Sequence, residues 1–199
     1  MTKDFSSVVK NRRSYYSLSK KSPISDEMIQ ETIEFAVNNT PSAFNSQSSR
    51  VVVLLGEQHD KLWNVTTETL RKIVPAENFA STEEKMASFK GAYGTVLFFE
   101  DQAVVEYLQK EYSLYEDKFP VWSAESGGML QYVVWTSLEM QGFGASLQHY
   151  NPLIDDSIKA EWNIPASWKL SAQMPFGTPT AEPFDKQVNP VAERVKVFK

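Results

Sequence analysis

The chain of 199 residues has no cysteine and only two histidines, His59 and His149. Without cysteine there is no disulfide, no thiolate nucleophile, no iron–sulfur cluster and no zinc site built on sulfur. The two histidines lie far apart and form no His-x-x-x-His motif, which argues against a histidine-rich metal centre. Positive charge is scarce too, because 20 Lys and Arg face 25 Asp and Glu. The resulting net charge of −5 argues against a nucleic-acid partner.

Long apolar runs are also missing, and no stretch approaches the length of a membrane-spanning helix or of a signal-peptide core. We therefore expect a cytoplasmic protein with no membrane partner. Aromatic residues, in contrast, are abundant: 12 Phe, 8 Tyr and 5 Trp. The length predicts one domain, residues 1–199, with a sizeable core. Such a domain either borrows its chemistry from a cofactor or only binds.

Hydrophobic periodicity predicts helices and strands that do not alternate regularly, which favours an α+β fold. Helices are expected over 4–13, from a Ser25 cap to a stop at 38–41, and over 57–74, 104–115, 123–141 and 151–162. Strands are expected over 51–55, 95–99 and 168–174, with an extended tail over 191–198. The strand at 51–55 is all apolar and is expected to be buried on both faces. The helix at 123–141 is apolar most of the way round, which is typical of a central helix.

The first polar cluster is Arg12, Arg13 and Ser14 at the end of the opening helix. Two guanidinium groups and a hydroxyl can bind a phosphate, since arginine offers a rigid fork of donors. The alternative is a solvated basic end that interacts favourably with the helix dipole.

The second cluster is the loop of residues 41–47, PSAFNSQ, which leads directly into the strand at 51–55. The amides of Asn45 and Gln47 each offer donors and an acceptor, so they can recognise the edge of a heterocycle. The alternative is a turn-rich connector whose amides bond to neighbouring backbone.

Two further segments lie towards the C-terminus. Residues 142–152 include His149, which could be a general acid, although a hydrogen-bonded structural histidine is the commoner case. Asn151 and Pro152 form a candidate N-cap and N1 pair for the next helix. After the segment MPFGTP, Lys186 could reach a phosphate, with a freely solvated lysine as the alternative.

Taken in order, NRRSYYSL, TPSAFNSQSSRVVVL, GFGASLQHYNP and MPFGTP followed by Lys186 and ERVKVF resemble the FMN-dependent nitroreductase family. The resemblance is greatest to its compact branch of bacterial copper-induced nitroreductases and fungal relatives, and covers about residues 5–198. It implies an α+β fold with a mixed, mostly antiparallel sheet wrapped by helices. It also implies an intertwined homodimer with two FMN sites at the interface.

The resemblance implies a role for each cluster. The FMN phosphate would be held by Arg12, Arg13 and Ser14, with Lys186 completing the site. A backbone N–H at Gln148 or His149 would face flavin N5, although many members have glycine in place of His149. The remaining flavin contacts, partly from the partner subunit, would come from Pro41, Ser42, Asn45 and Gln47.

The implied activity is ping-pong transfer of a hydride from NAD(P)H, followed by reduction of a small aromatic acceptor, a nitroaromatic or a quinone. Flavin N5 would carry the hydride, so no side chain need be a catalyst, and His149 is only a candidate. The alternative is a flavin-binding regulatory or stress protein on the same scaffold with little turnover. It is suggested by His149 and by the aromatic region between Tyr107 and Trp122.

Overall fold

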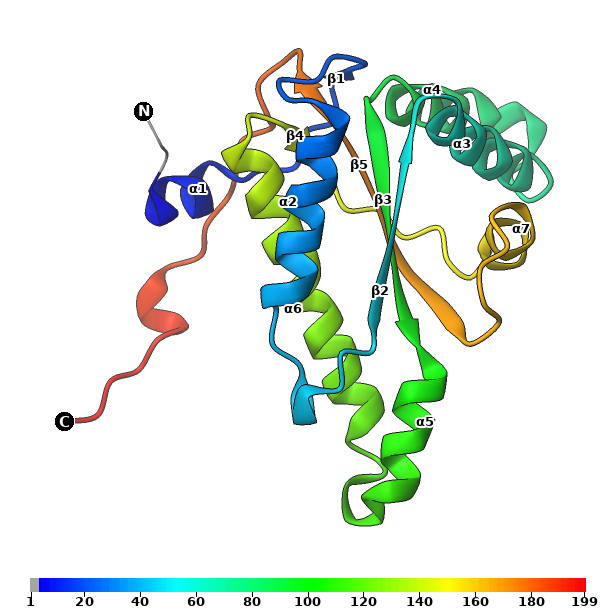
Figure 1. Ribbon diagram of the computed structural model, residues 1–199. Coiled ribbons are helices and arrows are strands. Elements are labelled where there is room, and N and C mark those ends of the chain that lie inside the picture. Colours follow the sequence, from blue (N-terminus) through cyan, green and yellow to red (C-terminus); the bar gives the residue numbers. More distant parts are fainter. Residues whose placement is uncertain (1–3) are drawn as a thin grey trace.

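An antiparallel β-sheet forms the centre of the computed structural model, which describes residues 4–199 (Figure 1). Residues 1–3 of the expected domain lie outside this range. The strands are β1 (Leu18–Ser19), β2 (Ser49–Leu55), β3 (Gly94–Asp101), β4 (Gly144–Ala145) and β5 (Trp168–Pro179). The helices are α1 (Phe5–Asn11), α2 (Asp26–Asn39), α3 (Gly56–Arg71), α4 (Phe79–Lys90), α5 (Gln102–Glu111), α6 (Phe119–Met140) and α7 (Asp155–Glu161). Short 3₁₀ turns are η1 (Ala43–Asn45), η2 (Ala76–Asn78), η3 (Ser113–Tyr115) and η4 (Val191–Glu193).

The strand order is β1-β5-β3-β2, with β4 also paired to β5, and these named pairs are all antiparallel. β3 is central and buried along its whole length, and it contains the strand predicted over 95–99. β2 lies at the sheet edge, and only Leu54 in it is buried. The expectation that residues 51–55 are buried on both faces is therefore wrong for the single chain. An all-apolar run does not distinguish a central strand from an edge strand that another surface covers.

Helices cover both faces of the sheet, and β3 supplies both cores by alternation (Figure 1). Val96 and Phe98 pack towards α2 and α6, whereas Leu97 and Phe99 pack towards α3, α4 and α7. The predicted α+β class is thereby confirmed. Within residues 4–199, no helix is long and apolar enough to cross a membrane.

The predicted helix starts are confirmed at two places. The Asp4 carboxylate accepts the Ser7 N–H at 3.1 Å, and the Ser25 hydroxyl accepts the Met28 N–H at 3.3 Å. The long helix, α6, begins four residues earlier than expected, at Phe119. It is not wholly enclosed, because Met129 and Tyr132 are about two-fifths exposed.

Other expectations are corrected. Asn151 and Pro152 do not open a helix: they lie in a turn in which the Asp155 N–H donates to the Pro152 carbonyl, and α7 begins at Asp155. The tail over 191–198 is not a continuous extended segment, since it contains the turn η4. Helix α4, over 79–90, was not predicted. The helix expected at 104–115 ends at Glu111 and is followed by η3.

Candidate functional site

The segment after α1 runs beside β4 at the edge of the sheet. Ser14 forms a parallel bridge with Ala145, and the Tyr15 N–H donates to the Ala145 carbonyl at 3.0 Å. Glycine is required at Gly144, because a Cβ there would lie 2.8 Å from Tyr15 Cγ. This close approach fixes Arg12, Arg13 and Ser14 beside the strand that leads to Gln148.

The two arginines of this segment have different surroundings. The Arg12 guanidinium carbon lies 4.3 Å from the centre of the Trp135 ring, and its buried Nε has no hydrogen-bond partner among residues 4–199. Arg13 instead donates from Nη2 to the Phe184 carbonyl. This bond ties the C-terminal segment to residue 13, and Lys186 follows only two residues later. Consecutive Cα atoms are about 3.8 Å apart, so Lys186 is kept within reach of the same region.

Together, Arg12, Arg13 and Lys186 form what we call the cationic cluster. A buried donor without an acceptor is unusual in a folded protein, because its desolvation is not compensated. A phosphate group would supply the missing acceptor and the opposite charge. The donor set of the cationic cluster therefore fits the phosphate of FMN.

In the segment 144–149, which begins with β4, alternate backbone N–H groups bond to β5. Ser146 and Gln148 donate their N–H groups to the carbonyls of Pro175 and Gln173, at 3.2 and 2.7 Å. Because backbone groups alternate along a strand, the His149 N–H is directed away from β5. Of the backbone N–H groups of Gln148 and His149, that of Gln148 is already bonded to the Gln173 carbonyl.

The side chains of Gln148 and His149 differ in the same way. Gln148 is buried, and its amide nitrogen donates to the Ser146 hydroxyl at 3.1 Å. The His149 side chain is exposed. Exposure does not favour the hydrogen-bonded structural histidine considered for this position.

His59 has the environment expected of a structural histidine. It is 1% exposed, with Nδ1 2.9 Å from the Thr95 hydroxyl and Nε2 3.2 Å from the Lys90 carbonyl. The Trp63 indole N–H also donates to Thr95, at 3.0 Å. Desolvation by burial lowers the pKa of His59.

The loop of residues 41–47, which we call the polar loop, has an unusual backbone. Phe44, Asn45 and Gln47 all have positive φ, at 57°, 51° and 48°. Non-glycine residues rarely adopt this region, and each costs about 1 kcal/mol or more. The Ser42 hydroxyl accepts the Gln47 N–H at 2.9 Å, and Arg50 donates to the Gln47 carbonyl at 2.6 Å. The loop is thus held by its own internal bonds.

Glu100 anchors the chain directly after the polar loop. Its carboxylate is 7% exposed and accepts hydroxyl bonds from Ser48, Ser49 and Ser123, at 2.8, 2.5 and 2.6 Å. Gly127 leaves room for it, since a Cβ there would lie 2.8 Å from Glu100 Oε1. Three hydroxyl donors compensate the desolvation of this carboxylate. Glu100 therefore connects β2, β3 and α6 at the base of the polar loop.

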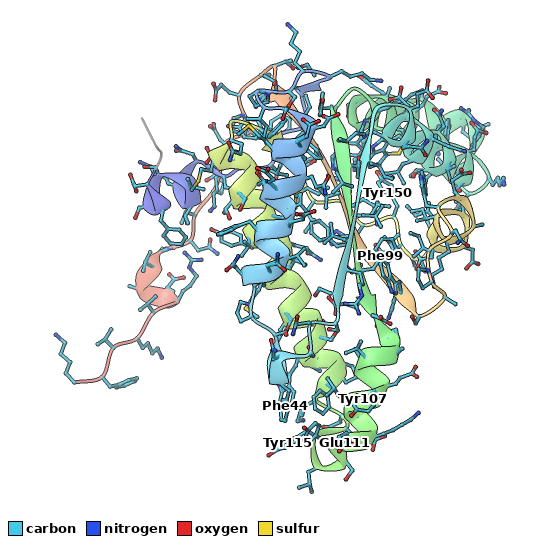
Figure 2. The ribbon with its side chains drawn as sticks, in the orientation of Figure 1. Phe44, Phe99, Tyr107, Glu111, Tyr115 and Tyr150 are labelled. Carbon is cyan, nitrogen blue, oxygen red and sulfur yellow. The ribbon has the colours of Figure 1, made fainter. Side chains whose placement is uncertain are left out.

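An aromatic cluster lies at the same end of the molecule. The Phe44 ring is within 6.1 Å, centre to centre, of four other rings: Tyr112, Tyr115, Phe119 and Trp122. Figure 2 shows Phe44, Tyr107 and Tyr115 at this end, where α5 and α6 meet. Phe44 remains half exposed.

The structure does not bring the polar loop to the cationic cluster within one chain. η1 follows the lower end of α2, whereas α1 lies beside the upper part of α6 (Figure 1). A cavity of about 480 Å³ adjoins the polar loop and is lined by Pro41, Ser42, Gln47 and Arg50 with parts of α2 and β2. The four predicted loop residues thus lie at the far end from Arg12, Arg13 and Ser14.

Three residues that shape these regions were not predicted. Trp135 belongs to the apolar pattern of α6, Glu100 follows an apolar strand, and Arg50 precedes one. The sequence around each of these residues predicts only the secondary structure in which it lies. Their roles depend on contacts between segments distant in sequence, as in the pairing of Arg12 with Trp135.

Comparisons with known proteins agree on one family. The sequence model described as "Nitroreductase family" matches residues 9–178. The nitroreductase FRM2 of Saccharomyces cerevisiae is 32% identical over 187 residues, which is 93% of each chain. The putative nitroreductase HBN1 of the same yeast is 36% identical over 88% of each chain. The structure of nitroreductase CinD from Lactococcus lactis in complex with chloramphenicol has a TM-score of 0.90 and 44% identity, covering 98% of this chain and 100% of that one.

Proposed function

Because the chain belongs to the nitroreductase family, we propose that it is an FMN-dependent oxidoreductase that uses NAD(P)H to reduce nitroaromatic compounds or quinones. The main support is the buried, unpartnered Nε of Arg12 in a cluster with Arg13 and Lys186. A buried guanidinium donor without an acceptor, next in sequence to a second arginine, has the chemistry of an anion site. A cytoplasmic location belongs to the same proposal.

Each predicted residue has a place in this proposal. Arg12 and Ser14 would bind the FMN phosphate, Lys186 would add charge, and Arg13 would hold the segment that carries Lys186. The backbone N–H of His149 would donate to flavin N5, while the buried side chain of Gln148 supports the strand. When bound, FMN supplies the redox chemistry by accepting a hydride from NAD(P)H and delivering electrons to the acceptor in ping-pong turnover.

The polar loop would contribute from the partner subunit of a homodimer. Pro41, Asn45 and Gln47 are exposed, and Ser42 and Arg50 bond to the backbone of Gln47, which carries one of the two amides. Such groups can recognise the polar edge of a planar ring. Their distance from the cationic cluster in one chain supports a site built from two copies (Figure 1).

Unburied apolar surface also supports a homodimer. The C-terminal tail extends away from the sheet (Figure 1) and exposes more than half of Val188, Val191, Val195, Val197 and Phe198. In the described part of the chain, the outer edge of β2 pairs with no strand. Monomeric proteins rarely leave such surfaces open, and an unpaired edge accepts another strand. We propose that the tail of each copy packs against the other.

The acceptor class is supported by the relative CinD, whose structures hold chloramphenicol and 4-nitrophenol. The test uses the purified full chain with added FMN, NADH or NADPH, and 4-nitrophenol or a quinone as acceptor. We expect NAD(P)H oxidation that requires both FMN and the acceptor. A protein that binds no FMN, or shows no oxidation with any of these pairs, contradicts the proposal.

Rapid mixing of the flavin-loaded protein with NAD(P)H, and then with an acceptor, distinguishes the proposed enzyme from a flavin-binding protein with little turnover. Fast loss of flavin absorbance with NAD(P)H, followed by its fast return with acceptor, is the result expected of an enzyme. Retention of FMN with a slow or absent response would instead favour the binding protein.

A complementation experiment tests whether one site uses two copies. Chains with Arg12→Ala are mixed with chains carrying Asn45→Ala and Gln47→Ala, and the heterodimer is isolated. If the site is shared, one of the two sites in the heterodimer is intact and FMN affinity returns at half the sites. If each site is built within one chain, no intact site forms.

A further inference from the structure

Trp135 lies under the guanidinium group of Arg12. The distance from Arg12 Cζ to the ring centre is 4.3 Å, which is the shorter of the two arginine–tryptophan contacts in the described residues. The ring is partly buried and packs against the core formed by α2, α6 and the sheet. Its position is therefore set by α6, which has 22 residues.

Stacking constrains a guanidinium group in a particular way. The flat face of the group lies against the ring, whereas its five N–H donors project from the edge, in the plane of the group. A stacked arginine is thus held in orientation without using its donors. An ion pair with a carboxylate would also orient it but would occupy those donors.

The surroundings of Arg12 are those of an arginine oriented by a ring and not by an ion pair. Within residues 4–199, no carboxylate forms an ion pair with Arg12, and its Nε is buried without a partner. The Arg50 guanidinium carbon lies over the Trp168 ring, 5.7 Å from its centre, but Arg50 also pairs with Asp101 at 3.0 Å. Arg50 is therefore fixed by internal bonds, while Arg12 is oriented by an aromatic ring and keeps its donors.

We propose that Trp135 is a positioning residue that holds Arg12 with its donor edge turned to the phosphate of FMN. The inference rests on the proposed function and adds a specificity element to it: Trp135 contributes to discrimination between FMN and riboflavin, which lacks the phosphate. Its effect passes through Arg12, so Trp135 itself need not touch the cofactor.

The test measures the affinity of the flavin-free protein for FMN and for riboflavin, and takes their ratio. Trp135→Leu is expected to lower the preference for FMN about 3- to 30-fold, the range of a cation–π contact, with little change for riboflavin. Trp135→Phe keeps a smaller ring and is expected to give an intermediate ratio. If the leucine variant does not fold, the phenylalanine variant decides, and a ratio equal to that of the wild type overturns the inference.

The matched control is Trp168→Leu, which removes the other arginine-stacked tryptophan and should leave the ratio unchanged. A double-mutant cycle completes the test, because Trp135→Leu should not alter the ratio in a chain that already carries Arg12→Ala. Equal losses for both flavins, or the same loss with and without Arg12, would overturn the inference. A wild-type protein without preference for FMN would instead contradict the proposed phosphate site.

Discussion

The cationic cluster and the polar loop differ in how far their polar groups are hydrogen-bonded within the chain. In the cationic cluster, Arg12 lies over the Trp135 ring, and its buried Nε has no hydrogen-bond partner among residues 4–199. In the polar loop, the backbone of Gln47 is held by Ser42 and Arg50, and Ser48, directly after the loop, donates to Glu100. The first region is electrostatically incomplete without an anion, whereas the second is complete before any ligand arrives.

The difference indicates what each region recognises. Unpaired charged donors favour a charged group and give a large affinity change when they bind one. A loop fixed by internal bonds presents neutral amides at defined positions, which suits the edge of a ring. We therefore expect substitutions in the cationic cluster to affect phosphate recognition and those around the polar loop to affect binding of the ring.

The largest effect is expected from Glu100→Ala. The buried hydroxyls of Ser48 and Ser123 would lose their acceptor, so the free energy of unfolding should fall by about 2–4 kcal/mol. The measurement is urea unfolding at one fixed protein concentration, with Glu106→Ala on the exposed side of α5 as control. Affinities for FMN and riboflavin should fall together. A phosphate-specific loss would contradict the assignment of the polar loop to the ring.

Arg12→Ala should follow in size. Loss of a charge-assisted bond costs about 1.5–3 kcal/mol, so the affinity for FMN should fall about 10- to 150-fold. Riboflavin affinity should change little. Titration of the flavin-free protein with each flavin measures both values. If Arg12→Ala lowered the affinities for FMN and riboflavin equally, the cationic cluster would not be specific for the phosphate.

The pH dependence of stability provides a third test, away from both regions. Burial lowers the pKa of His59 in the folded protein, so the unfolded chain binds its proton more readily. The contribution of neutral His59 to the free energy of unfolding is fully present above the pKa of the unfolded chain, about 6.5. This contribution is lost as the pH falls towards the lower pKa of the folded protein. Unfolding free energies of the wild type and His59→Gln should therefore converge as the medium becomes acidic.

His149→Gln is the matched control, because the other histidine of the chain is exposed. Its pH dependence between these pKa values should follow that of the wild type. If the two substitutions changed the dependence equally, burial of His59 would not be its cause.

The smallest effect is expected for His149→Ala. If only the backbone N–H serves the flavin, kcat/KM should stay within about twofold of the wild type, an energy change of less than about 0.5 kcal/mol. Steady-state rates with NADH and 4-nitrophenol measure this. A loss of several orders of magnitude would make the side chain a proton donor.

The sequence predicted features that depend on nearby residues. The Asp4 and Ser25 caps, the strand at 95–99 and the α+β class are confirmed, because capping and periodicity are local signals. The order of four motifs also identified the family, which the comparisons confirm.

Most of the errors concern contacts between distant residues, and one concerns a local turn. β2 was expected to be buried because its sequence is apolar, but its exposure depends on its place at the sheet edge. Asn151 and Pro152 have the residue types of a helix start, yet the chain turns there instead. Trp135 contacts Arg12, and Glu100 accepts a hydrogen bond from Ser48. No local pattern in the sequence predicts either contact.

The most direct measurement of the central claim is a crystal structure of the protein with FMN bound. We expect the phosphate to lie within hydrogen-bond distance of Arg12, above Trp135, in one copy, while residues 41–47 of the partner approach the ring. A flavin bound elsewhere, or contacting the cationic cluster and the polar loop of the same chain, would contradict it.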